Sequence, residues 1–285
     1  MQYILLAVTA TALMFQNVFK QEFDRRTKNG AMFFSGLISL FAMLFFLAVN
    51  RDWAYDNGTL PYSAGFALSY LCATLFAVLA IRNGSLAKTA LILSYSLLIP
   101  TLYGILFLGE PISVTMGIGS PCLVLSLFLI NYEKETDARK VTWRWVFPVT
   151  MAFIGNGMCS VIQKAEQIAY PQGGANLFMI VALAISAVLL LGIPILVPRE
   201  RRNIPFVLAS GWWLALLCGG ANGLVNLLVL YLNGRMSASI LFPLISGGSM
   251  VLILLWSLLV RKERFSARQT VGFLLGILSI VLLNL

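Results

Sequence analysis

The sequence predicts an all-α integral membrane protein with ten transmembrane helices, arranged as two inverted five-helix repeats. Three observations lead to this fold class: an excess of apolar residues, ten apolar segments separated by turn signals, and similar residue spacings in the two halves. Of the 285 residues, 59% are hydrophobic and 11% are charged, and the mean hydropathy is +0.88. A soluble domain is about 45–50% apolar and about 25% charged. This chain therefore carries more apolar surface than one soluble core can bury.

Ten segments are apolar enough to cross a bilayer as helices, and most are close to the required length. They run over residues 3–22, 31–49, 64–81, 86–108, 112–131, 145–165, 175–197, 211–232, 237–260 and 267–285. Turn-forming sequences such as KNG, DNGTLP, RNGS, YPQGG and PRERRNIP separate them. The most polar linker, residues 133–144, follows the fifth segment. We therefore expect one repeat over residues 1–132 and a second over residues 145–285.

The two halves have similar residues at similar spacings. Segments one and six both end in a sequence that contains Lys-x-Glu. When Glu110 is aligned with Glu263, Gly119 falls on Gly272. Since five is an odd number of helices, a second copy of the unit must insert in the opposite orientation. This inverted repeat is typical of secondary transporters.

Two stretches of the chain resemble the EamA-like transporters of the drug/metabolite transporter superfamily. The first, IPTLYGILFLGEPISVTMGIG, contains Pro100, Glu110 and Gly119, and the second, which begins FPLISGGSMV, contains Pro243, Glu263 and Gly272. The resemblance implies ten helices, two inverted halves and a central cavity lined mainly by helices one, three, four, six, eight and nine. The substrates of the family are diverse metabolites, so the resemblance implies transport without identifying the solute.

Polar residues within the predicted spans are the candidates for lining this cavity, because such residues usually face the interior of a helix bundle. Helical spacing places Asn156, Ser160 and Gln163 on one face of segment six, and Asn222 and Asn226 on one face of segment eight. The remaining candidates, from segments one, four and nine, are Gln16, Asn17, Tyr95 and Ser246. The alternative is that these side chains only join helices through interhelical hydrogen bonds.

The sequence also suggests roles for two lysines, two prolines and two glycines within the spans. Lys20 and Lys164 are possible contacts for an anionic substrate, but each lies near a helix end, which favours extension of the ammonium to the membrane interface. Pro100 and Pro243 each remove a backbone hydrogen bond and should kink or break a span. Gly272 and Gly276 form a GxxxG pair, which we interpret as a helix-packing surface.

The paired glutamates are interpreted as structural. Glu110 and Glu263 each precede the last helix of a half, where a carboxylate favours the positive end of the helix dipole. Pro111 suits the first position of the helix that follows Glu110. Ser266 and Gln269 have the spacing of a capping box in the second half.

The composition also argues against several functional classes. There is no histidine, and Cys72, Cys122, Cys159 and Cys218 each lie alone in an apolar segment, so we expect no metal site, no cofactor and no enzymatic activity. The acidic residues all lie near segment ends or in loops, which argues against the mid-span carboxylate on which small multidrug transporters rely. The net charge of +9 is explained by basic loops rather than by nucleic-acid binding.

The distribution of basic residues predicts the orientation. All 20 lysines and arginines except Arg51, Lys164 and Arg235 fall in one set of alternate loops. The positive-inside rule then places those loops in the cytoplasm and both termini outside it, in a plasma (inner) membrane protein.

The sequence thus predicts a secondary transporter that exports or exchanges a small metabolite by alternating access around a central cavity. Its predicted partners are that metabolite and the lipid bilayer, and the oligomeric state stays open. The alternatives are a membrane-embedded enzyme acting on lipid or isoprenoid, and a membrane sensor or partner protein that transports nothing.

Overall fold

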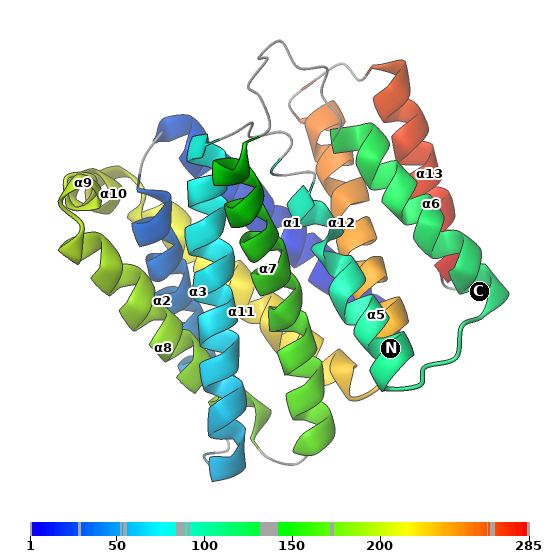
Figure 1. Cartoon of the computed structure of the whole chain (residues 1–285), viewed down its shortest axis with the longest axis horizontal. Helices are drawn as coiled ribbons and strands as arrows, with labels where there is room; N and C mark the ends of the chain where they lie inside the picture. The colour runs from blue at the N-terminus through cyan, green and yellow to red at the C-terminus, as the bar shows by residue number, and fades with distance from the viewer. Residues whose placement is uncertain are drawn as a thin grey trace.

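A computed structural model gives the fold of the chain. It describes residues 2–27, 30–51, 53, 56–83, 89, 92–131, 142–171, 174–260, 262 and 266–283. Within these residues the secondary structure is helical, and no strand is present. The helices stand side by side, and the two ends of the chain lie at the same end of the bundle (Figure 1).

Seven helices in the described part of the chain are long and apolar enough to span a membrane. They are α1 (Gln2–Arg26), α2 (Ala31–Val49), α3 (Leu60–Asn83), α7 (Trp143–Ala169), α8 (Ala175–Leu196), α11 (Trp212–Asn233) and α12 (Ala238–Leu259). Three shorter apolar helices are Ile92–Phe107, which comprises the 3₁₀ turn η2 (Tyr95–Leu97) and α5 (Leu98–Phe107), then α6 (Val114–Asn131) and α13 (Ala267–Leu283). The chain is a multi-pass membrane protein.

The sequence PRERRNIP, which we expected to be a turn, is helical instead. It contains α9 (Pro198–Arg201) and the start of α10 (Ile204–Ser210). Pro198 and Pro205 each lie in the first turn of their helix, where proline is favoured because its missing N–H has no intrahelical partner. Arg82 at the end of α3 forms an ion pair with Glu200 of α9, which fixes this segment against the bundle.

A left-handed glycine precedes both α2 and α8. Gly30 precedes α2 with φ 89°, and Gly174 precedes α8 with φ 76°. Residues with a side chain rarely adopt this conformation. Glycine therefore allows the chain to reverse at both places.

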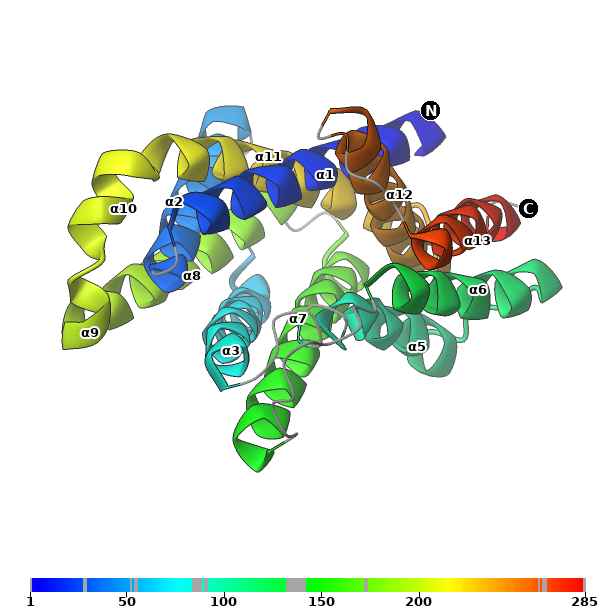
Figure 2. The ribbon, with the colours of Figure 1, turned by 90° about the horizontal axis from the view of Figure 1, so that it is seen from above.

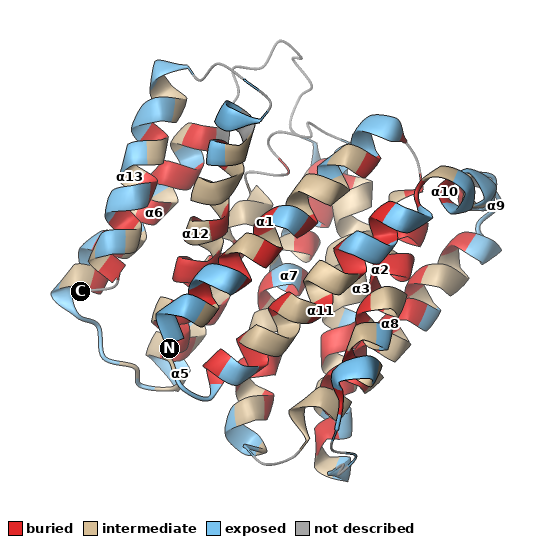
Figure 3. Ribbon diagram, turned by 180° about the vertical axis from the view of Figure 1, so that it is seen from behind, coloured by how far each residue is buried: buried red, intermediate tan, exposed pale blue. Residues whose placement is uncertain are grey.

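Helices from different halves pack against each other throughout the bundle. Residues of α3 lie against α7, residues of α1 against α11, and α2 lies against α8 (Figure 2). Buried residues lie mainly where helices meet, and exposed residues lie mainly on the outer faces of the bundle (Figure 3). Large apolar side chains such as Leu106, Val188 and Leu196 are among the exposed ones. In a membrane protein such side chains contact lipid.

The contact between α6 and α13 is reciprocal. Ser126 Oγ donates to Gly272 O at 2.6 Å, and Ser279 Oγ donates to Gly119 O at 2.9 Å. The alignment that pairs Glu110 with Glu263 also pairs Ser126 with Ser279 and Gly119 with Gly272. A Cβ atom on Gly272 would come within 2.8 Å of Ile130 Cγ1, so glycine is needed for this close approach. Gly276 likewise lies against Ser126, so both glycines of the GxxxG pair lie in this helix contact.

Candidate functional site

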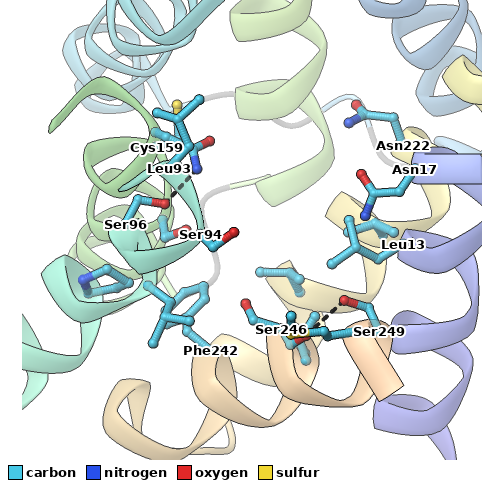
Figure 4. A pocket seen from close by; sticks show the side chains of 18 of the residues that line it. Leu13, Asn17, Leu93, Ser94, Ser96, Cys159, Asn222, Phe242, Ser246 and Ser249 are labelled. Carbon is cyan, nitrogen blue, oxygen red and sulfur yellow. Dashed lines mark hydrogen bonds between the residues drawn. The ribbon is translucent and has the colours of Figure 1, made fainter. Parts of the chain in front are cut away.

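A cavity of about 600 Å³ lies within the bundle, lined by helices from both parts of the sequence (Figure 4). Its lining comes from α1, α3, residues 93–100, α7, α11 and α12, with smaller contributions from α6 and α8. These include the six helices that the family resemblance implied. Volumes of 300–1,000 Å³ are usual for small-molecule sites.

One polar wall of the cavity is built around the 3₁₀ turn that precedes α5. The Asn156 side-chain nitrogen donates to Ser96 Oγ at 2.6 Å. Ser94 points into the cavity beside this pair (Figure 4). Pro100 lies in the first turn of α5 and lines the cavity as well. Proline has no N–H and so cannot donate the backbone hydrogen bond to the preceding helical turn. The span contains a 3₁₀ turn at this place, where it faces the cavity.

The opposite wall carries a chain of side-chain amides. Gln163 Nε2 donates to Asn226 Oδ1 at 2.8 Å, and Asn226 Nδ2 donates to Asn222 O at 2.9 Å and to Asn222 Oδ1 at 3.0 Å. Asn17 and Asn222 lie next to each other on this wall, across the cavity from Ser94 and Ser96 (Figure 4). Within the described part of the chain, the Asn17 amide makes no hydrogen bond.

The described lining residues include no charged side chain. The polar groups are amides and hydroxyls, among them Tyr70, Ser160, Ser246 and Ser249, and the other lining residues are mainly apolar, such as Phe66. Burying an ion without a partner costs far more than burying a neutral group that can form hydrogen bonds. The cavity is therefore suited to an uncharged polar molecule.

Comparison with known proteins connects this cavity to a family. The family model described as "EamA-like transporter family" matches residues 142–285. The chain belongs to the EamA-like transporter family. Members of this family are generally transporters. No curated protein sequence matches the chain.

The fold of this EamA-family chain also occurs among solved structures, of which 28 chains match. One of them, described only as the crystal structure of a protein, has a TM-score of 0.72 and 14% sequence identity. The match covers 98% of this chain and 94% of that chain. At this identity the likeness shows the fold alone.

Seven of the nine residues predicted to line the cavity do so in this family member: Asn17, Asn156, Ser160, Gln163, Asn222, Asn226 and Ser246. Gln16 and Tyr95 do not. Gln16 is buried beside α11, and Cys218 Sγ donates to its backbone oxygen. Tyr95 lies in a shallow apolar pocket against α6, and its hydroxyl donates to Val124 O at 3.2 Å.

Helical geometry accounts for both corrections. Successive residues of a helix point in directions about 100° apart, or about 120° in a 3₁₀ turn. Gln16 therefore points in a direction about 100° from that of Asn17 and is buried, and Tyr95 points toward α6 although Ser94 and Ser96 on either side of it line the cavity. The hydroxyl-bearing lining residues outside the predicted set are Tyr70, Ser94, Ser96 and Ser249, all of them within apolar segments.

The two lysines do not line the cavity. Lys20 is half-buried in α1. Lys164 is buried, and its ammonium donates to Asn233 O at 2.7 Å and to Met236 O at 2.6 Å. Lys164 therefore binds carbonyl oxygens at the end of α11 and in the turn that follows, and does not reach into the cavity.

Glu110 caps a different helix from the one that we expected. Its Oε1 accepts from Ala238 N at 2.7 Å and its Oε2 accepts from Ser239 N at 2.8 Å, both at the start of α12. We expected a cap on the helix that follows Glu110 in the sequence. There, Ser113 Oγ accepts from Met116 N instead.

In the second half the predicted capping box is confirmed. Ser266 N donates to Gln269 Oε1 at 3.0 Å, and Gln269 N donates to Ser266 Oγ at 3.3 Å. Glu263 lies outside the described residues. Pro243, which we expected to kink or break its span, lies inside α12, which continues through it without a break.

Proposed function

We propose that this protein is a secondary transporter that moves a small, uncharged polar metabolite across the plasma membrane by alternating access. The observation that carries the proposal is the uncharged cavity whose polar groups come from both halves of the chain. In this proposal the ten spans form two inverted repeats, over residues 1–132 and 145–285, that rock around the cavity. Such a site between repeats is typical of secondary transporters.

Backbone features that recur at equivalent positions support the repeat. When each residue is replaced by its aligned residue in the other half, the Ser126–Gly272 contact becomes the Ser279–Gly119 contact, and both are present. A left-handed residue precedes the paired glutamate in each half, Gly109 with φ 63° and Lys262 with φ 54°. Lys262 is the single non-glycine residue with positive φ among the described residues. Since a lysine rarely adopts this conformation, its occurrence where the other half has glycine favours a shared backbone design.

The substrate class follows from the cavity walls. Asn17 and Asn222 present amide groups on one side, and Ser94, Ser96 and Asn156 present polar groups on the other. A solute with hydrogen-bonding groups at both ends, such as a nucleoside or a polyol, can contact both walls at once. A phosphate or a quaternary ammonium would find no opposite charge among the described lining residues.

The proposed orientation has both termini outside the cytoplasm. Arg51 and Arg235 follow helices that end on the side of the termini, whereas the helix ends that carry Arg26, Arg82, Arg144 and Arg268 lie at the end of the bundle opposite to the termini (Figure 1). The positive-inside rule assigns that end to the cytoplasm. A periplasm-active reporter fused after residue 285 tests this assignment, since an inactive reporter would reverse it.

Two steps test the transport proposal. A metabolite comparison of cells with and without the protein identifies candidate solutes, and purified protein in liposomes is then assayed with the radiolabelled candidate. Asn222→Leu and Asn156→Leu should each lower transport at least about tenfold, because each replaces a cavity amide by an apolar group.

Tyr95→Phe is the matched control. Tyr95 was a candidate from the sequence but lies outside the cavity, so this variant should transport like the unmodified protein. Normal transport by both asparagine variants would reject the proposed site. Transport of a permanently charged solute in preference to uncharged ones would reject the substrate class.

A further inference from the structure

Two charged side chains hold the turn between α11 and α12. Lys164 of α7 donates to Asn233 O, at the last residue of α11, and to Met236 O within the turn. The carbonyl end of a helix carries a partial negative charge. The ammonium therefore occupies a position where a cation is favoured.

Glu110 binds the other side of the same turn. Its two carboxylate oxygens accept from Ala238 N and Ser239 N, the first two residues of α12. These N–H groups have no partner within their own helix, and hydrogen bonds from them to a carboxylate are charge-assisted. Glu110 and Lys164 thus bind the two ends of one turn, Lys164 at Asn233 and Met236 and Glu110 at Ala238 and Ser239. We call this set of contacts the Glu110–Lys164 clamp.

Two glycines near Glu110 allow its carboxylate to reach α12. A Cβ atom on Gly104 would overlap the Glu110 carboxylate, so only glycine leaves room for it on α5. Gly109 ends α5 in the left-handed conformation, and Glu110 N then donates to Gly104 O at 3.1 Å. This reversal points the carboxylate back toward α12, 128 residues later in the chain.

The clamp lies just beyond one end of the cavity. The last lining residues at that end are Gln163, Val229 and Phe242, which are adjacent to or one helical turn from Lys164, Asn233 and Ala238. This is the end at which the termini lie, as the course of α5 and α12 shows (Figure 1). In the other direction the lining continues to Ile130 and Leu254, near the opposite ends of α6 and α12.

We propose that the Glu110–Lys164 clamp closes the cavity on the side of the termini, and that it opens and re-forms during each transport cycle. The inference rests on the proposed function, since only a transporter needs both sides to open in turn. Glu110 belongs to the first half and its partners belong to the second, so the clamp joins the two parts that would move. Charged groups and helix ends are readily rehydrated when a contact opens, unlike a packed apolar seam.

Cysteine accessibility tests the clamp. The four free cysteines are replaced by serine, and Val229→Cys is introduced at the end of the cavity next to the clamp. Oriented membrane vesicles are treated with a membrane-impermeant maleimide from one side at a time. With the clamp intact, labelling from the termini side should be slow.

Glu110→Gln should accelerate this labelling at least about tenfold, because one of the two accepted hydrogen bonds is lost together with the charge. Glu110→Asp should restore part of the protection, since it keeps the carboxylate. Gly104→Ala, which displaces the carboxylate without changing it, should act in the same direction as Glu110→Gln. It provides an independent test if Glu110→Gln fails to fold.

The outcomes separate the two proposals. If Val229→Cys is labelled from the opposite side but labelling from the termini side is unchanged by Glu110→Gln and Gly104→Ala, the clamp is refuted and the transport proposal stands. If neither Val229→Cys nor Ser249→Cys is labelled from either side, the cavity is closed to water and both proposals fail.

Discussion

Gly155 provides the sharpest test of how the helices around the cavity pack. It lies in α7, next to Asn156, where α7 crosses α3. A Cβ atom at this position would come within 2.7 Å of both Ala73 N and Ser69 O, which are backbone atoms of α3. Ordinary van der Waals contact begins at about 3.4 Å. Gly155→Ala therefore forces the two helix backbones apart by several tenths of an ångström, since neither atom can rotate away.

The expected loss of stability combines two terms. Overpacking of this kind costs about 1–3 kcal/mol. Alanine also stabilises a helix relative to glycine by about 0.5–1 kcal/mol. The net destabilisation from Gly155→Ala is therefore between about 0 and about 2.5 kcal/mol, centred near about 1 kcal/mol. Gly220 in α11 has no atom within 4 Å of its hypothetical Cβ, so Gly220→Ala retains only the favourable term.

Thermal unfolding of the purified protein in detergent measures the difference. A thiol-reactive dye reports unfolding through the native free cysteines, of which Cys218 is buried. A combined difference of about 2 kcal/mol corresponds to a gap in Tm of about 5 °C between the two variants. Equal Tm values, or a more stable Gly155→Ala, would refute the close contact of α3 with α7.

Three further predictions concern hydrogen bonds and backbone conformation. Ser126→Ala and Ser279→Ala should each lower the free energy of unfolding by about 0.6 kcal/mol, as is usual for hydrogen bonds between membrane helices, and a clear difference between the two would contradict their equivalence. Ser266→Ala removes the hydroxyl that caps Gln269 N and should cost about 1 kcal/mol in the same assay; an unchanged Tm would argue against the cap. Gly109→Ala has open space around its Cβ but keeps φ at 63°, so it should cost about 1–2 kcal/mol through backbone strain alone, and no loss in a denaturant titration would argue against that conformation.

The sequence predicted the position of most helices well. Runs of apolar residues bounded by Gly, Pro and charged residues located α2, α6 and α8 to within about two residues. The same reasoning missed α9 and α10, because their prolines and charges are equally typical of a turn. Polar residues at helical spacing found most of the cavity, since a polar side chain in a membrane span has few other places to go.

The partners of the charged residues could not be read from the sequence. Glu110 caps a helix that begins 128 residues away, and Lys164 binds carbonyl oxygens 69 and 72 residues away. Backbone N–H and C=O groups occur at nearly every position, so the sequence does not mark which of them a charged side chain will bind. Local spacing was informative for Ser266 and Gln269, whose partners are three residues apart.

The reciprocal contact between α6 and α13 sets a limit on which parts of the protein need to rearrange. If the halves exchange conformations during transport, a contact between non-equivalent helices, such as α3 with α7, takes on the geometry of its counterpart, α1 with α11. The Ser126–Gly272 and Ser279–Gly119 bonds are each other's counterparts, so the exchange leaves this helix pair as it was. The α6–α13 pair can then stay fixed while the other helices move around it. A covalent cross-link between α6 and α13 should therefore leave transport intact, whereas a cross-link across the cavity should stop transport.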